Sequence, residues 1–81
     1  MPDNHVFDLI AQHTREVIPE LDGHHFEPSD SLRDLGANSI DRAEIIIMTL
    51  ESLSVSIPLV ELADAKNIGE LADLIHGKSA V

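Results

Sequence analysis

Ser39 has the strongest case for covalent chemistry of any residue in this chain. It stands where a polar loop meets an apolar helical pattern, in the run Leu35-Gly36-Ala37-Asn38-Ser39-Ile40-Asp41-Arg42-Ala43-Glu44-Ile45. A catalytic serine needs a base within hydrogen-bond reach and a third group that orients the base. The sequence places no such base beside Ser39, and Asp41 stands where the hydrolase pattern G-x-S-x-G has its second glycine. Ser39 is therefore interpreted as a site that another enzyme modifies, with an ordinary helix-start serine as the alternative.

The histidines are the other residues with possible chemistry: His5, His13, His24, His25 and His76. The adjacent pair His24-His25, flanked by Asp22 and Glu27, contains ligand types that zinc or nickel accepts. Adjacent histidines usually point apart, however, and no H-x₃-H spacing supports the pair. Solvated loop histidines are the favoured interpretation, so we expect no metal site and no autonomous catalysis.

Length and composition predict one small domain over residues 1–81 with an aliphatic core. The chain has no cysteine, 43% apolar residues and only two aromatic residues, Phe7 and Phe26. Disulfides and thiolate metal sites are therefore excluded. A domain of this size is not expected to hold a deep pocket of ~300 Å³ or more in addition to its core.

The charge is strongly acidic, with 15 Asp and Glu against 5 Lys and Arg, for a formal net charge of −10. This balance disfavours nucleic acids and anionic membrane surfaces as partners. It favours enzymes with basic patches, although solubility alone is an equally good explanation of the charge. No basic leader followed by an apolar run is present, and no apolar run approaches the ~20 residues of a membrane span. We expect a cytoplasmic monomer.

Apolar residues at steps of three and four predict a first helix over residues 3–18, capped by Asp3 or Asn4 and ended by Pro19. His13 falls on the same face as the apolar residues, although its side chain is polar.

A long connection over residues 19–38 leads to the second helix, predicted over residues 39–53 with Asn38 as its cap. Loops of this length are unusual in compact domains and are often functional. One turn of helix is expected within the loop, over residues 29–35. The second helix is apolar on almost every side, and a small domain cannot bury all of it, so one exposed apolar strip should mark a partner surface.

Residues 54–58 predict an extended link that has no partner strand. A short third helix is expected over residues 59–65, and a last helix over residues 68–76, between its cap Asn67 and Gly77 at its C-terminal end. The chain beyond Gly77 should be loose. The predicted fold is all-α, a bundle of three main helices plus one short helix. The core is expected to draw on Phe7, Ile10, Leu32, Leu35, Ile46, Leu53, Ile57, Ile68, Leu71 and Ile75.

Over nearly its whole length the chain resembles an acyl carrier protein. The family's modified serine matches Ser39, and the glycine shortly before that serine matches Gly36. The apolar-acidic pair that follows the serine matches Ile40-Asp41, and the glutamate of the family's second helix matches Glu44.

The resemblance continues beyond the second helix, where an Ile-Pro pair matches Ile57-Pro58 and the family's last helix matches residues 67–75. Three positions depart from the family pattern. Asn38 replaces the usual aspartate before the serine, Arg42 adds a positive charge, and Leu53 stands where phenylalanine is common. Asparagine caps a helix nearly as well as aspartate, so the structural role of position 38 is kept.

The resemblance implies that Ser39 carries a 4′-phosphopantetheine arm, which a phosphopantetheinyl transferase installs from coenzyme A. The thiol of the arm would hold acyl groups as thioesters, and the chain would be a carrier rather than an enzyme. Its motif is most similar to polyketide-type carriers and, more narrowly, to free-standing acetyl donors of β-branching cassettes. The implied partners are acyltransferases, ketosynthases or 3-hydroxy-3-methylglutaryl (HMG) synthase-like enzymes. A fatty-acid carrier, a peptidyl carrier and a helical interaction module without an arm remain alternatives.

The same resemblance places Ile40, Ala43 and Ile47 on the outer side of the second helix, with Asp41 and Glu44 around them. At 100° per residue, the three apolar positions do fall on one strip. We call these three residues the docking strip and expect it to contact an apolar patch on a partner enzyme.

Overall fold

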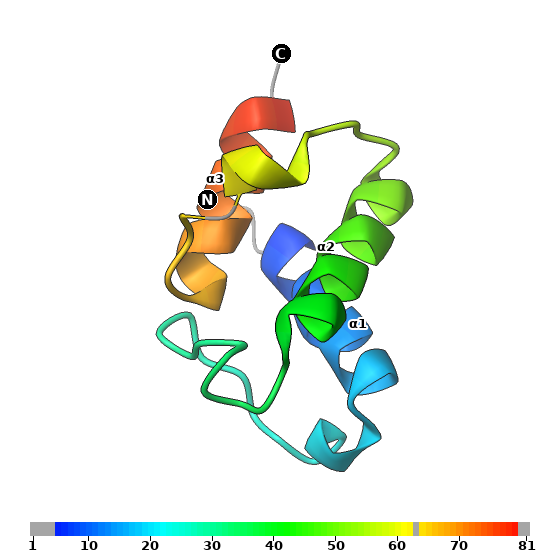
Figure 1. The fold of residues 1–81 in the computed structure, drawn as a ribbon, viewed down its shortest axis with the longest axis vertical. Helices are drawn as coiled ribbons and strands as arrows, with labels where there is room; N and C mark the ends of the chain where they lie inside the picture. The colour runs from blue at the N-terminus through cyan, green and yellow to red at the C-terminus, as the bar shows by residue number, and fades with distance from the viewer. Residues whose placement is uncertain (1–4, 63, 80–81) are drawn as a thin grey trace.

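The computed structural model describes residues 5–62 and 64–79, and no strand occurs within them. The α-helices are α1 (His5–Val17), α2 (Ser39–Leu53) and α3 (Ile68–Ser79) (Figure 1). Two 3₁₀ helices lie in the connections, η1 (Pro19–Leu21) and η2 (Leu59–Leu62). The predicted all-α bundle of three main helices is confirmed. None of the helices in the described ranges combines the length and the apolar character needed to cross a membrane.

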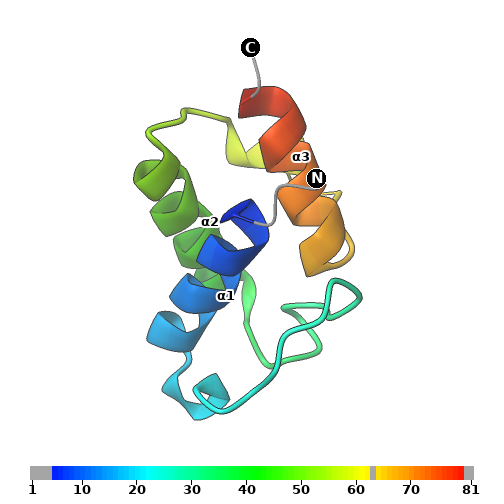
Figure 2. The same cartoon turned by 180° about the vertical axis from the view of Figure 1, so that it is seen from behind.

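Helix α1 packs against both α2 and α3, and in the view from behind it lies between them (Figure 2). It runs antiparallel to both partners, so α2 and α3 begin at the same end of the bundle. The long loop after η1 crosses this end before it enters α2. The loop, the start of α2 and the start of α3 are therefore close enough to build one site.

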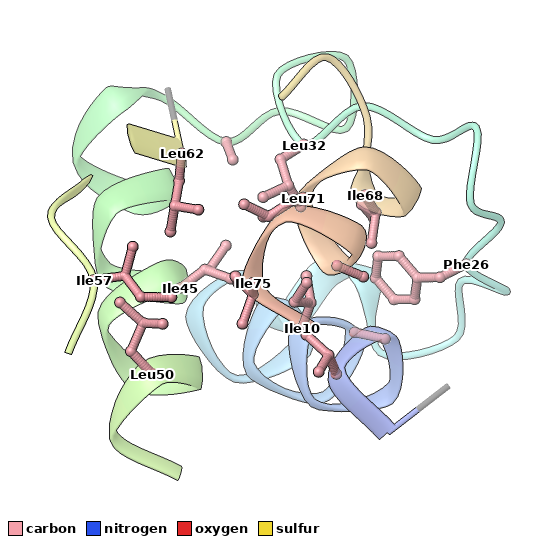
Figure 3. Close-up of a cluster of buried hydrophobic side chains, with 14 residues drawn as sticks. Ile10, Phe26, Leu32, Ile45, Leu50, Ile57, Leu62, Ile68, Leu71 and Ile75 are labelled. Carbon is pink, nitrogen blue, oxygen red and sulfur yellow. The ribbon is translucent and has the colours of Figure 1, made fainter. Parts of the chain in front are cut away.

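The core fills the space between the three helices (Figure 3). Six of the predicted core residues are buried, namely Ile10, Leu32, Ile57, Ile68, Leu71 and Ile75. The prediction was wrong for four others, which are only partly buried at the edge of the core: Phe7, Leu35, Ile46 and Leu53. Leu53 lies in the last turn of α2, and Ile46 borders a cavity, so neither is covered on all sides. Phe26 is buried as well and packs the loop onto the core, as the sequence indicates. The prediction missed Val6, Ala11, Ala37, Ile45, Leu50, Leu62 and Ala72.

Three polar side chains are buried in this apolar core, and each has a hydrogen-bond partner, as burial requires. Thr14 and Thr49 donate to the carbonyls one turn earlier in their helices, at 2.6 and 2.8 Å. The ring of His13 is hydrogen-bonded to Glu16 at 2.8 Å and to Ser52 at 2.9 Å. His13 thus joins α1 to α2, which explains a polar residue on the apolar face of the first helix.

The N-terminal half differs from the prediction mainly at its turns. Helix α1 ends at Val17, one residue early, and its predicted caps lie outside the described residues. Pro19 also begins η1, because its fixed φ suits the first residue of a helical turn. The turn expected over residues 29–35 closes through a bond from the Leu35 N–H to the Ser31 carbonyl at 3.0 Å and does not extend into a helix.

The C-terminal half differs in the length of two helices. The third helix is shorter than predicted, with η2 ending at Leu62. Helix α3 continues through Gly77 to Ser79, so the predicted end at Gly77 and the loose state of Lys78 and Ser79 were wrong. The helix can continue through Gly77 because a glycine inside a helix lowers its stability by only ~1 kcal/mol. In addition, the ion pair between Lys78 and Glu61, at 2.9 Å, holds the last turn of α3 near η2.

Candidate functional site

Gly36 turns the chain into the mouth of α2. Its φ of 105° lies in a region that residues with a side chain rarely adopt. Bonds from the Gly36 N–H to the Arg33 carbonyl (3.1 Å) and from the Ala37 N–H to the Leu32 carbonyl (2.9 Å) close this turn. Ala37 is buried, whereas the next two residues are exposed. The loop is thus anchored immediately before Ser39, which lies at the surface.

Asn38 caps α2 as predicted. Its backbone is extended, and its side-chain oxygen accepts the N–H of Asp41 at 2.8 Å. Ser39 is the first helical residue and points its exposed side chain from the positive end of a 15-residue helix. Free backbone N–H groups and the helix dipole make such a position favourable for a phosphate.

Within the described residues, no hydrogen bond joins the Ser39 side chain to a base. The two loop histidines have other partners: His24 is paired with Asp30 at 2.9 Å, and His25 with Glu27 at 3.0 Å. No group of three or more potential metal ligands occurs in the described part of the chain. This geometry suits a hydroxyl that receives a group from another enzyme better than one that attacks a substrate.

The docking strip lies on the side of α2 away from the core. Ile40 is 76% exposed and Ile47 is 44% exposed, whereas Ala43 is partly buried. Glu44 is exposed beside them, and Asp41 is partly buried. These residues share one accessible surface of the helix; their contact with a partner stays a prediction.

Sequence reasoning missed two exposed apolar residues on η2, Leu59 and Val60, the latter 78% exposed. The available signal was the apolar pair that follows Pro58 at the start of the predicted short helix over residues 59–65.

A cavity of about 460 Å³ lies between the loop, the first turns of α2, the end of η2 and the start of α3. It is a half-open hollow at the surface and not the deep pocket that the length of the chain argues against. It is lined by apolar side chains, among them Leu32, Ile46 and Leu62, and by polar ones, among them Arg33 and Lys66.

Asp30 fixes the loop beside this cavity. Its carboxylate accepts the Glu27 N–H and the His24 ring Nε2, both at 2.9 Å, and its carbonyl accepts the Ile68 N–H at 2.8 Å. The bond from the Glu27 backbone, followed by the bond and charge of His24, lowers the pKa of the Asp30 carboxyl below its ordinary value of 3.8. The Asp30 side chain therefore holds the loop together, and its backbone carbonyl joins the loop to α3.

Comparisons with known proteins match this fold and indicate a family. The family described as "Phosphopantetheine attachment site" matches residues 8–75. The chain is 54% identical over 78 residues to the polyketide biosynthesis acyl-carrier protein AcpK of Bacillus subtilis (strain 168), covering 96% of this chain and 95% of that protein. A crystal structure of the Curacin biosynthetic pathway HMG synthase in complex with acetyl donor-ACP contains a chain that is 53% identical to this one. The TM-score is 0.88, with 95% of this chain and 99% of that chain covered.

Proposed function

The chain belongs to the family of carrier proteins with a phosphopantetheine attachment site, and we propose that Ser39 is the residue that holds the arm. The protein is an acyl carrier of the polyketide type, in which acyl groups travel as thioesters on covalent 4′-phosphopantetheine. The observation that carries the assignment of Ser39 is its position, exposed in the first turn of α2 behind a capped and anchored loop.

The chemistry of attachment supports the same residue. The arm is joined through a phosphodiester, whose negative charge is stabilised by the N-terminus of α2. Asn38 already satisfies the N–H of Asp41, and the first helical bond runs from the Arg42 N–H to the Asn38 carbonyl at 2.9 Å. The mouth of the helix is therefore ordered before modification, and the transferase meets a rigid hydroxyl.

The first prediction tests this assignment directly. Ser39→Ala should fold normally and gain no mass when it is incubated with coenzyme A and a phosphopantetheinyl transferase, whereas the unchanged chain should gain one arm by mass spectrometry. Ser29→Ala is the matched control, because Ser29 is an exposed serine in the preceding loop. An arm on the Ser39→Ala protein would show that another serine is modified. A chain that never gains an arm would instead be an interaction module.

The proposed partner is an HMG synthase-like enzyme that receives an acetyl group from this carrier. Support comes from the 53% identity to a chain in a solved HMG synthase complex described as containing an acetyl donor-ACP. The carrier family also requires a phosphopantetheinyl transferase, and acyltransferases or ketosynthases are the expected suppliers or users of other cargo. Acetyl transfer from the loaded chain to such a synthase, followed by mass spectrometry of both proteins, tests the donor role.

The docking strip is the proposed contact with that enzyme. Ile40 and Ile47 supply exposed apolar area next to Ser39, so the partner's active site and its docking patch would be adjacent. Glu44 and Asp41 at the edge would meet Lys or Arg on the enzyme. We further propose a single cytoplasmic domain that works as a monomer, and the net charge of −10 opposes binding to nucleic acids or anionic membranes.

A further inference from the structure

A serine, a histidine and a glutamate form one hydrogen-bonded row where α1 meets the last turn of α2. The ring Nε2 of His13 lies 2.9 Å from the Oγ of Ser52, and its Nδ1 lies 2.8 Å from the Oε1 of Glu16. A hydroxyl within hydrogen-bond reach of a base, which a third group orients in turn, is the arrangement that activates a serine. Ser52 lies at the opposite end of α2 from Ser39, about 20 Å away along the helix axis.

The partners of the His13 ring select the tautomer that a base needs. A carboxylate only accepts hydrogen bonds, so Glu16 assigns the hydrogen of the neutral ring to Nδ1. Nε2 then keeps its lone pair and accepts the hydroxyl hydrogen of Ser52. The proton of Ser52 therefore already points at the nitrogen that would take it.

This row leads from the interior of the bundle to its surface. The His13 side chain is 10% exposed, whereas the Glu16 side chain is 49% exposed and Ser52 is exposed. The base is therefore shielded from water, while the hydroxyl can be reached by a reactant from solvent. The buried hydroxyls of Thr14 and Thr49 differ, because each donates to a carbonyl of its own helix.

The place of Ser52 on α2 decides which reactants suit it. Its turn is the negative end of a 15-residue helix, which stabilises an imidazolium formed beside it. The N–H groups of a last turn are bonded within the helix, so they are not available as donors to an oxyanion. Only an acyl group that is already activated, such as a thioester, is therefore expected to react, and it should react once per chain rather than with turnover.

We propose that Ser52 is a second acyl-acceptor site, which takes the acyl group of a thioester with His13 as its base and Glu16 as the positioning residue. The Ser52 Oγ attacks the carbonyl carbon while the His13 Nε2 takes the hydroxyl proton. A C–O bond forms, the C–S bond breaks, and His13 returns the proton to the leaving thiolate, so the products are an O-acyl serine and a thiol. Acyl thioesters are the cargo of this family of carriers, and the step does not itself require an arm on Ser39.

Acylation of Ser52 would also change the contact between α1 and α2. A serine ester has no hydroxyl hydrogen, so it cannot donate to the Nε2 of His13, and the bond that joins the two helices is lost. His13 is buried, and a buried polar atom that loses its partner lowers the stability of the folded state. The acylated chain should therefore melt at a lower temperature than the unmodified chain.

The test offers two acetyl thioesters to the isotopically labelled, folded chain. One is acetyl-coenzyme A, and the other is an unlabelled copy with Ser52→Ala that bears acetyl on its own arm. Peptide mass spectrometry then measures how fast each serine of the labelled chain gains an acetyl group. Ser52 should react at least about tenfold faster than Ser56, a smaller advantage than the roughly 10²–10⁴ that a positioned base supplies in enzymes. Ser56 is the matched control, because it is exposed and has no hydrogen-bonded base within the described residues.

Substitutions then separate a base from a merely structural bridge. His13→Gln keeps an amide that can bond to Ser52 but removes the base, so Ser52 should react no faster than Ser56. Glu16→Gln, at a half-exposed position, keeps an oxygen that can accept the Nδ1 hydrogen but removes the charge, so it should slow the acetylation of Ser52 while the chain stays folded by circular dichroism. Reaction with only one donor would support the site and identify the source of the acyl group. Equal rates at Ser52 and Ser56 with both donors, or an unchanged rate at Ser52 in the folded Glu16→Gln protein, would overturn it.

Discussion

Asn38 shows how one residue prepares the attachment site without taking part in the chemistry. Its side-chain oxygen accepts one of the orphan N–H groups of α2, at Asp41, and leaves the neighbouring Ser39 exposed. An aspartate, which the acyl-carrier pattern has at this position, would perform the same capping role and would add a negative charge. Capping and charge are therefore separable at this position.

The second prediction uses that separation. Asn38→Ala should lower the free energy of unfolding by about 1 kcal/mol, because a helix cap is lost. Asn38→Asp should be at least as stable as the unchanged chain, because aspartate also caps and its charge suits the helix N-terminus. Urea denaturation of the three proteins measures both effects. Equal stability of the alanine variant would mean that the cap contributes nothing.

The sequence predicted the cap Asn38 and the helix start at Ser39 but did not reveal that the Arg42 guanidinium donates to the Ala37 carbonyl at 2.9 Å. The cap and the helix start depend on neighbouring residues, which a local pattern contains. The position of the Arg42 side chain depends on a cavity assembled from the loop, α2, η2 and α3, and no single segment reports that arrangement.

At the scale of secondary-structure elements, the hydrogen bonds between the loop and the start of α3 hold the site together. We call this contact the loop–α3 joint. The Ile68 and Gly69 N–H groups donate to the Asp30 and Pro28 carbonyls, both at 2.8 Å. The orphan donors at the start of α3 are thus satisfied by the loop, while Asn67 caps the Glu70 N–H at 2.8 Å. The loop that leads to Ser39 is therefore fixed by a helix whose bonded residues follow Pro28 and Asp30 by 41 and 38 positions in sequence.

The third prediction concerns pH. The folded pKa of Asp30 lies below its ordinary value of 3.8, so the carboxylate contributes stability that is fully present above pH 3.8 and is lost as pH falls through the folded pKa. Asp30→Asn should therefore destabilise the protein at neutral pH, and the difference from the unchanged chain should shrink below pH 3.8. Asp22→Asn, at an exposed loop carboxylate with no hydrogen-bond partner in the described ranges, should show no such trend. Chemical denaturation from neutral to acidic pH provides the measurement.

The fourth prediction compares two glycines in α3. A Cβ at Gly69 would lie 3.0 Å from both Cβ and the carbonyl oxygen of Pro28, and neither the ring nor the bonded backbone can yield easily. Gly69→Ala should destabilise the protein by about 1–3 kcal/mol. A Cβ at Gly77 would meet nothing within 4 Å, so Gly77→Ala should stabilise by about 0.5–1 kcal/mol. Thermal melts of the two variants measure both changes in stability. If both variants were stabilised, or both destabilised, the result would contradict the close contact between Gly69 and Pro28.

The boundaries of α2 were predictable, but the end of α3 was not. Helix α2 is capped by Asn38 at its start and ends at Ser54, whose backbone is in the left-handed conformation (φ 56°), so both boundaries depend on local residues. Gly77 looked like the end of α3 because glycine commonly follows a helix. The helix continues because its φ remains ordinary and Lys78 reaches Glu61 on η2, a contact that sequence patterns do not contain.

At the scale of the whole molecule, one face of α2 lies in the core and the opposite face is exposed to solvent. Ile45, Thr49 and Leu50 face the core, whereas Ile40 and Ile47 face solvent on the other side. Exposed apolar residues contribute little to folding, so we propose that the solvent-facing apolar residues of α2 contact a partner. Ser39 and the proposed docking strip lie on the same helix, so the fold sets their positions relative to each other.

The last prediction separates these two surfaces. Ile47→Ala should weaken binding to the HMG synthase-like partner while lowering stability by less than about 1 kcal/mol, because its side chain is 44% exposed. Leu50→Ala, three residues away but buried, should instead lower stability by about 2–5 kcal/mol.

Glu44→Lys should slow association, and the effect should fade at high salt, because edge charges act mainly through long-range attraction. Paired thermal melts and binding kinetics test all three variants. A large stability loss for Ile47→Ala would place its side chain in the core and remove the centre of the docking strip, and unchanged partner binding would show that the enzyme contacts another face.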